Sequence, residues 1–150
     1  MGQKIAFTSS EEKIATEAMD KLIKLYGNCA LEEADVIVAL GGDGFMLQTL
    51  HQTQDLSAPV YGMNRGTIGF LMNSYAEKDL LQRLKNSEEE KLNPLRMEAI
   101  TTDGSVKTAL AINEVSLLRA GPQAAKLSIS IDGKPRMSCL LYTSPSPRDR

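Results

Sequence analysis

One carboxylate, Asp43, lies among three glycines in the run Gly41-Gly42-Asp43-Gly44. Glycines at a turn let the backbone come close to a ligand that a Cβ atom would obstruct. A helix that begins here would direct its first N–H groups and the positive end of its dipole toward the loop, which suits a phosphate. Phosphoryl transfer also needs a carboxylate to orient or deprotonate the attacking hydroxyl. The run therefore predicts a phosphate site with Asp43 as its catalytic residue, or else a turn aspartate that bonds its own loop.

A second glycine-rich turn, Asn-Arg-Gly-Thr-Ile-Gly-Phe-Leu at residues 64–71, follows a short apolar run at residues 59–63. Two such loops at the ends of neighbouring parallel strands would form a crevice at the carboxyl edge of a sheet, where α/β proteins bind ligands. Phe70 in this turn is expected either to stack on a base or to join the core. Arg65 is expected either to meet a phosphate or to lie on the surface.

Polar side chains also follow a later apolar run, since Asn113 and Glu114 come directly after residues 108–112. The pair predicts hydrogen-bonding partners if it is buried, or a strand end that faces solvent. His51 is the only histidine, and we expect it on a helix surface or satisfied inside rather than as a base. Cys29 and Cys139 have no metal-binding spacing and are predicted to be reduced thiols.

The elements that position these residues alternate in the first half of the chain. Residues 36–40 are apolar and β-branched, which favours a strand buried on both faces, and a helix follows the glycine run. We also predict strands at 4–8, 29–31 and 59–63, and helices at 11–26 and 77–85, the second capped by Ser74. The residues expected on the apolar faces of these two helices are Ile14, Ala18, Leu22, Leu25, Leu80, Leu81 and Leu84.

The second half reads as strands, at residues 96–102, 106–112, 115–118 and 126–131, with hairpin turns at Asp103-Gly104 and Asp132-Gly133. The predicted fold class is α/β, with a Rossmann-like parallel sheet followed by an incomplete, antiparallel all-β domain. We predict a nucleotide-binding α/β domain at 1–93, the start of a β-rich domain at 94–140, and a foreign or disordered tail at 141–150.

Composition narrows the classes of partner. The chain has 150 residues, of which 42% are hydrophobic and 24% are charged, and a formal net charge of −2. That charge gives no support for nucleic-acid binding, which needs a basic surface. No apolar run approaches the roughly 20 residues of a membrane span, and the first residues lack the apolar segment of a secretory signal. We therefore expect a cytoplasmic protein that binds neither nucleic acid nor membrane.

Three motifs together resemble those of the NAD kinase family: the glycine run at 41–44, the stretch GMNRGTIGFL at 62–71, and the pair Asn113-Glu114. Lipid kinases and phosphofructokinases have turns like the first motif, so the combination carries the resemblance. It covers residues 4–139. Members of the family continue well beyond this length, so the resemblance implies a C-terminally truncated, bacterial-type chain with little or no activity of its own. Gln48 stands where many members have arginine.

The resemblance implies a kinase that uses ATP and Mg²⁺, or another divalent cation, to phosphorylate the 2′-hydroxyl of the adenosine ribose of NAD, giving NADP. Asp43 would be the proton acceptor and would also contact the ligand. The other residues implied in ligand binding are Gly44, Asn113, Glu114 and Phe70, and no residue is assigned as a metal ligand. A homo-oligomer is implied for the full-length form. Two alternatives stay open: a relative of diacylglycerol kinases, and a nucleotide-binding module without catalysis.

Overall fold

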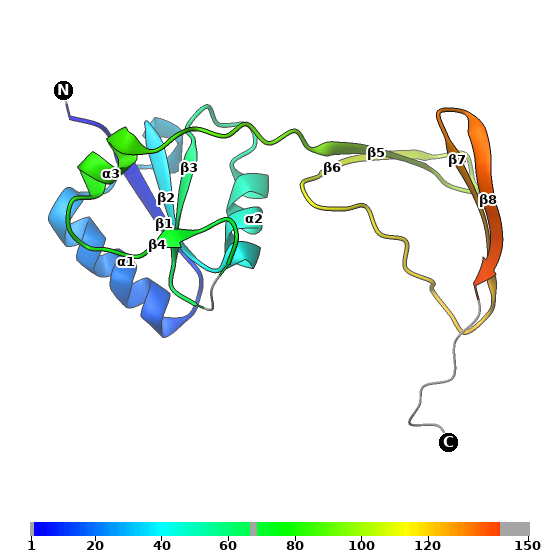
Figure 1. Ribbon diagram of the computed structural model, residues 1–150, viewed down its shortest axis with the longest axis horizontal. Coiled ribbons are helices and arrows are strands. Elements are labelled where there is room, and N and C mark those ends of the chain that lie inside the picture. The colour runs from blue at the N-terminus through cyan, green and yellow to red at the C-terminus, as the bar shows by residue number, and fades with distance from the viewer. Residues whose placement is uncertain (1, 67–68, 142–150) are drawn as a thin grey trace, which may run out of the picture.

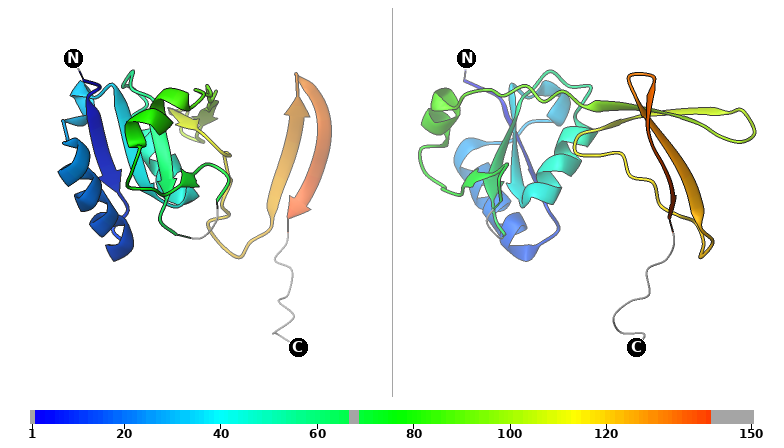
Figure 2. Two further views of the ribbon diagram at one scale, coloured as in Figure 1. Left: turned by 60° about the vertical axis from the view of Figure 1, so that its left-hand side comes forward. Right: turned by 45° about the vertical axis from the view of Figure 1, so that its right-hand side comes forward.

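The computed structural model describes residues 2–66 and 69–141. An α/β unit contains all the helices of this part of the chain, and two β-hairpins extend to one side of it (Figure 1). The two further views show the same separation between the unit and the second hairpin (Figure 2). The predicted fold class, a Rossmann-like sheet followed by antiparallel β-structure, is therefore confirmed.

A parallel sheet with the order β1-β2-β3-β4 forms the centre of the unit. Its strands are β1 (Ile5–Ser9), β2 (Val36–Gly41), β3 (Val60–Asn64) and β4 (Asn73–Ser74). Every residue of β2 is buried, as its run of β-branched and apolar residues predicts. The central strand therefore fixes the position of the glycine run that follows it.

Helices cover both faces of the sheet (Figure 1). Helices α1 (Lys13–Tyr26) and α3 (Leu80–Asn86) lie on one face, and α2 (Asp43–Gln52) lies on the other. Side chains alternate between the faces along each strand, so Val36, Val38 and Leu40 join the core under α1 and α3. Burying such aliphatic side chains contributes about 1.5–3 kcal/mol each to folding. The carboxyl ends of the strands are thereby held rigid.

The contact face of α1 differs in part from the predicted one. Ala15, Ala18 and Leu22 are buried, whereas Ile14 and Leu25 are 49% and 59% exposed. Small alanine side chains let the helix approach the sheet closely. The two alanines and Leu22 therefore form the contact stripe, and Ile14 and Leu25 lie beside it. The predicted end of the helix is confirmed, since Gly27 caps α1 at φ 78° and donates its N–H to the carbonyl of Ile23.

Two further expectations in the first half are wrong. Residues 29–31 do not form a strand: a 3₁₀ helix, η1 (Leu31–Glu33), follows, and Cys29 gives one hydrogen bond to the carbonyl of Ile5. Helix α3 begins at Leu80 instead of residue 77, because Asp79 has a left-handed backbone with φ 58°, which a right-handed helix cannot include. Ser74 does not cap the helix and pairs with Asn64 in the sheet. Leu80 and Leu84 are buried, but Leu81 is 50% exposed.

Two antiparallel hairpins follow the α/β unit. They consist of β5 (Leu95–Ile100) with β6 (Val106–Ala111), and β7 (Ala125–Ile131) with β8 (Lys134–Leu141). Both predicted turns are confirmed: Gly104, Asp132 and Gly133 have positive φ angles of 84°, 52° and 72°, which glycine and aspartate adopt at hairpin tips. Residues 115–118, predicted as a strand, belong to an exposed connection between the hairpins.

The domain boundary near Pro94 stays a prediction, and residues 142–150 of the predicted tail lie outside the described residues. Among residues 2–66 and 69–141, no helix combines the length and the apolar character that crossing a membrane requires.

Candidate active site at the carboxyl edge of the sheet

The loops after β1, β2 and β3 meet at one edge of the sheet, as the strand order requires. Main-chain hydrogen bonds join them. The N–H of Ser10 donates to the carbonyl of Leu40 at 2.9 Å, and the N–H of Arg65 donates to the carbonyl of Gly41 at 2.8 Å. The two glycine-rich stretches are therefore neighbours in space, as predicted from the sequence.

The glycines of the first stretch lie in different surroundings, and only Gly41 is required by packing in the described structure. A Cβ atom on Gly41 would stand 2.8 Å from Cβ of Phe45, so glycine is needed for α2 to pack against β2. Gly42 and Gly44 have no such neighbour within 4 Å, and neither has a positive φ angle. Gly44 lies in the first turn of α2 and is exposed, so a side chain there would extend into open space.

Asp43 is the first residue of α2 and does not cap the helix with its side chain. Its carboxylate instead accepts two main-chain hydrogen bonds from the second stretch. The N–H of Phe70 donates to Oδ2 at 2.7 Å, and the N–H of Leu71 donates to Oδ1 at 3.1 Å. The alternative of an aspartate bonded only within its own loop is therefore wrong: Asp43 links two loops that are 27 and 28 residues apart in sequence.

Phe70 is fully exposed at 102%, so its predicted place in the core is wrong. The main-chain N–H of Phe70 bonds Asp43, while its ring lies on the surface. Stacking on a base, the other reading of Phe70, stays a prediction.

Arg65 is held against the α/β unit. Its guanidinium carbon lies 4.0 Å above the ring of Tyr75, and its Nε donates to the carbonyl of Ile14 at 3.4 Å. A cation over an aromatic face is stabilised by the ring quadrupole. The arginine therefore holds the start of the second stretch against α1 in a partly buried position, and its contact with a phosphate stays a prediction.

A small ionic cluster continues from this arginine. Nζ of Lys21 donates to Oε1 of Glu77 at 3.1 Å, and the hydroxyl of Tyr75 donates to the same atom at 3.2 Å. The hydrogen bond from Lys21, with lesser help from Tyr75 and Arg65, lowers the pKa of Glu77. Burial, and then Glu77, raise the pKa of Tyr75. The cluster ties α1 to the segment before α3.

Asn113 and Glu114 are both exposed in the connection that follows β6. In the described part of the chain, no hydrogen bond or ion pair joins them to Asp43 or to the second glycine stretch. The solvent-facing reading of the pair therefore describes this structure. The structure brings together Asp43, Gly44 and the main chain at Phe70, and it leaves the Asn113-Glu114 pair apart.

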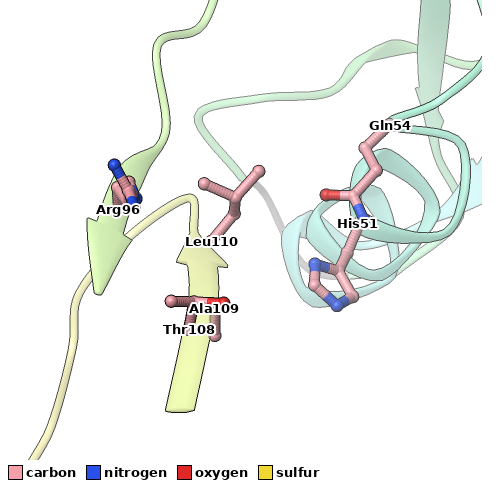
Figure 3. Close-up of a pocket in the computed structure, with 6 residues that line it drawn as sticks. All are labelled: His51, Gln54, Arg96, Thr108, Ala109 and Leu110. Atoms are coloured by element: carbon pink, nitrogen blue, oxygen red, sulfur yellow. The ribbon is translucent and has the colours of Figure 1, made fainter. Parts of the chain in front are cut away.

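His51 is exposed near the end of α2, which confirms the helix-surface reading. It lines a cavity of about 360 Å³ between α2 and the first hairpin (Figure 3). Asp43 is at the opposite end of the same helix, so the cavity is separate from the glycine loops. The lining residues are His51, Gln54, Arg96, Thr108, Ala109 and Leu110.

Among the described residues, no three histidine, cysteine, aspartate or glutamate side chains are placed to hold a metal ion together. Both cysteines are free, as predicted. Two features of the site have no signature in the sequence: the main-chain donors to Asp43, and Oγ of Ser10, which is buried without a hydrogen-bond partner among the described residues. The two glycine-rich stretches indicate that loops meet here, but they do not identify the donors, because main-chain donors do not depend on residue type.

Comparison with known proteins agrees with this architecture. Residues 1–91 match the family model described as the ATP-NAD kinase N-terminal domain. An NAD kinase from Cereibacter sphaeroides is 63% identical over 139 residues, which cover 93% of this chain and 55% of the relative. An NAD kinase from Caulobacter vibrioides is 52% identical over 138 residues, covering 92% and 53%. The chain thus spans about half the length of these relatives, and it belongs to the NAD kinase family.

Proposed function

We propose that this chain carries the phosphoryl-transfer site of an NAD kinase, in which ATP phosphorylates the 2′-hydroxyl of the adenosine ribose of NAD to give NADP. The observation that supports this most is the position of Asp43, at the first residue of α2 and between two loops at the carboxyl edge of the sheet. Asp43 accepts the proton of the attacking hydroxyl, which is the task of a general base.

The start of α2 is suited to the phosphates. The first N–H groups of a helix have no acceptor within it, and the helix dipole favours negative charge there. Gly44 leaves the approach to these groups open, since a Cβ atom at that position has no neighbour within 4 Å. Glycine at position 44 therefore supports direct contact between the backbone and the ligand.

The described side chains fit a magnesium ion that is bound partly by the substrate. Asp43 is the carboxylate at this edge, and the described residues offer no cluster of three metal-binding side chains. Mg²⁺ is commonly bound by one or two carboxylates together with substrate phosphates. Asp43 would therefore hold the ion together with phosphate oxygens, and when bound the ion would neutralise charge that develops on the transferred phosphoryl group.

The remaining assignments are part of the same proposal. Phe70 is an exposed aromatic ring next to the main chain that Asp43 binds, so it is available to stack on the adenine base. Asn113 and Glu114 are exposed polar groups and are assigned to the ribose hydroxyls of NAD. The protein that carries this chain would work in the cytoplasm as a homo-oligomer, with an α/β domain at 1–93 and a β-rich domain from 94.

The test uses a chimera in which the matched residues of this chain replace the corresponding part of the Cereibacter sphaeroides relative. Asp43→Asn should lower kcat for NADP formation by at least about 100-fold, the lower end of a general acid–base contribution. The KM for NAD should change less, because the main-chain donors remain. Asp55→Asn is the control, since Asp55 is exposed just beyond α2.

An Asp43→Asn chimera whose kcat stays within a few-fold of the parent would reject the catalytic role. Turnover of diacylglycerol instead of NAD would select the lipid-kinase alternative, and NAD binding without NADP formation by the parent chimera would select the non-catalytic module.

A further inference from the structure

The side of the second glycine stretch that faces Asp43 has a feature that the proposed function does not use. Gly69 lies directly against the carboxylate of Asp43. A Cβ atom on Gly69 would stand 2.5 Å from Cγ and 2.8 Å from Oδ2 of Asp43, and closer still to Oδ1. Real Cβ atoms do not approach other heavy atoms this closely, so any side chain at position 69 requires the carboxylate or the loop to move.

The carboxylate of Asp43 cannot move away from position 69 without weakening its own hydrogen bonds. Aspartate has a short side chain, and both of its oxygens accept hydrogen bonds, from the N–H groups of Phe70 and Leu71. Hydrogen bonds to an ionised acceptor are about twice as strong as neutral ones. A Cβ atom at position 69 would push on the two oxygens that these donors bond and on the Cγ atom between them. The close approach of Gly69 to Asp43 and the two hydrogen bonds therefore depend on each other.

The crowding beside position 69 is not shared by the other glycine of the same loop. Gly66, in the same stretch, gives the contrast: in the described part of the chain, a Cβ atom there would come within 4 Å only of Oδ1 of Asn64, at 4.0 Å. The two glycines therefore differ in what lies beside them.

We infer that Gly69 is a positioning residue for Asp43: its missing side chain lets the main chain at Phe70 and Leu71 hold the carboxylate in the orientation used for proton transfer. The inference rests on the proposed function for its kinetic consequence but not for its geometry. An ionised carboxylate has about four acceptor directions, so two remain for the substrate hydroxyl after the two main-chain bonds. Gly69 thereby fixes which two directions are left.

The geometric test uses hydrogen–deuterium exchange on the chimera with the Cereibacter sphaeroides relative, and this measurement does not need activity. Gly69→Ala should speed amide exchange in the peptide that contains Phe70 and Leu71, and Asp43→Ala should do the same. The double variant should exchange no faster than either single variant, because both remove one arrangement. Gly66→Ala should exchange like the parent. Equal protection of Phe70 and Leu71 in Gly69→Ala and in the parent would overturn the inference.

The kinetic test uses the chimera with the Cereibacter sphaeroides relative. Gly69→Ala should lower kcat by about 10- to 100-fold, the scale that a misplacement of about 1 Å produces, with a smaller change in the KM for NAD. In an Asp43→Asn background, the same substitution should lower kcat little further, since residues that act as a unit are not additive. Melting curves identify any variant that fails to fold. If Gly69→Ala does not fold, the exchange measurement on Asp43→Ala decides. Unchanged protection of Phe70 and Leu71 in Asp43→Ala would then overturn the inference.

The two hypotheses fail differently. A kcat that falls in Asp43→Asn but not in Gly69→Ala rejects the positioning role and leaves the proposed function intact. A kcat that is unchanged in Asp43→Asn rejects the catalytic role of Asp43, while faster exchange in Gly69→Ala would still support the geometric role of Gly69.

Discussion

At the scale of single residues, the two carboxylate oxygens of Asp43 have both a structural role and a proposed catalytic role. Its oxygens hold the second glycine stretch through the N–H groups of Phe70 and Leu71. The same oxygens have to accept a proton from the substrate in the proposed reaction. Main-chain donors suit both tasks, because they fix the orientation of the carboxylate without adding a full charge beside it.

Glu77 gives a prediction about pH at the same scale. The hydrogen bond from Lys21 holds its pKa below the ordinary value of 4.5 in the folded chain. A carboxyl group with a lowered pKa stabilises the fold above its unfolded-state value and loses this contribution as pH falls through the folded-state value. Glu77→Gln should therefore lower the Tm at pH 7, and the difference from the parent should shrink below pH 4.5. The difference should also fall with added salt, because the pair is partly exposed.

The control for this prediction is Glu17→Gln. Glu17 pairs with Lys13 at 3.8 Å within α1, and both side chains are more than half exposed. Such pairs contribute little to stability, so this variant should show a smaller pH-dependent change in Tm. A Tm difference for Glu77→Gln that is the same at pH 7 and at pH 3 would contradict the role of its charge.

At the scale of elements, α3 shows how one helix separates two leucines that look alike in the sequence. Leu80 is fully buried under the sheet, whereas Leu81 is 50% exposed. The helix has only 7 residues, and short helices depend on tertiary packing more than on their own propensity. Leu80 and Leu84 are therefore the residues that attach α3 to the core.

We expect Leu80→Ala to lower the free energy of unfolding by about 2–5 kcal/mol, the range for a buried leucine replaced by alanine. Leu81→Ala is the matched control, and it should cost well under half as much because half of its surface is already in water. Urea denaturation followed by circular dichroism measures both. Equal costs for the two variants would show that α3 packs through a different face.

At the scale of the whole molecule, the apolar core lies in the α/β unit, whereas much of the exposed apolar surface lies in the hairpins. Among residues 2–66 and 69–141, the buried hydrophobic side chains all lie between Ile5 and Leu84. The hairpins expose many large apolar side chains, among them Ile100, Val106, Leu110, Ile129, Ile131, Met137, Leu140 and Leu141. Each hairpin has two strands, and such hairpins are marginally stable unless something packs on them.

The 150-residue chain by itself should therefore self-associate and form little or no NADP. Exposed strand edges and apolar faces favour association between copies, and an open site admits water where transfer needs fixed donors. Size-exclusion chromatography with light scattering and an assay for NADP measure both properties. A monodisperse monomer that turns over at the rate of about 1–100 s⁻¹ typical of kinases would contradict this expectation.

The sequence by itself determined the features that depend on local pattern. The β-branched run of β2 specified a strand buried on both faces, because a central parallel strand has no side that faces water. Asp103-Gly104 and Asp132-Gly133 specified the two hairpins, because few other residues adopt the positive φ angles of such turns. The motifs were also sufficient to identify the family, and they located Asp43 at the start of a helix.

Tertiary structure decided what depends on contacts between distant segments. Which leucine of α3 is buried, and whether Ser74 caps a helix or joins the sheet, follows from how the chain returns to β3. Residues 115–118 have the apolar composition of a strand but find no partner strand in the described chain. The partners of Asp43 were equally hidden, because main-chain N–H groups look the same at every position. Only the fold brings Gly69, Phe70 and Leu71 against a carboxylate 26 or more positions earlier in the chain.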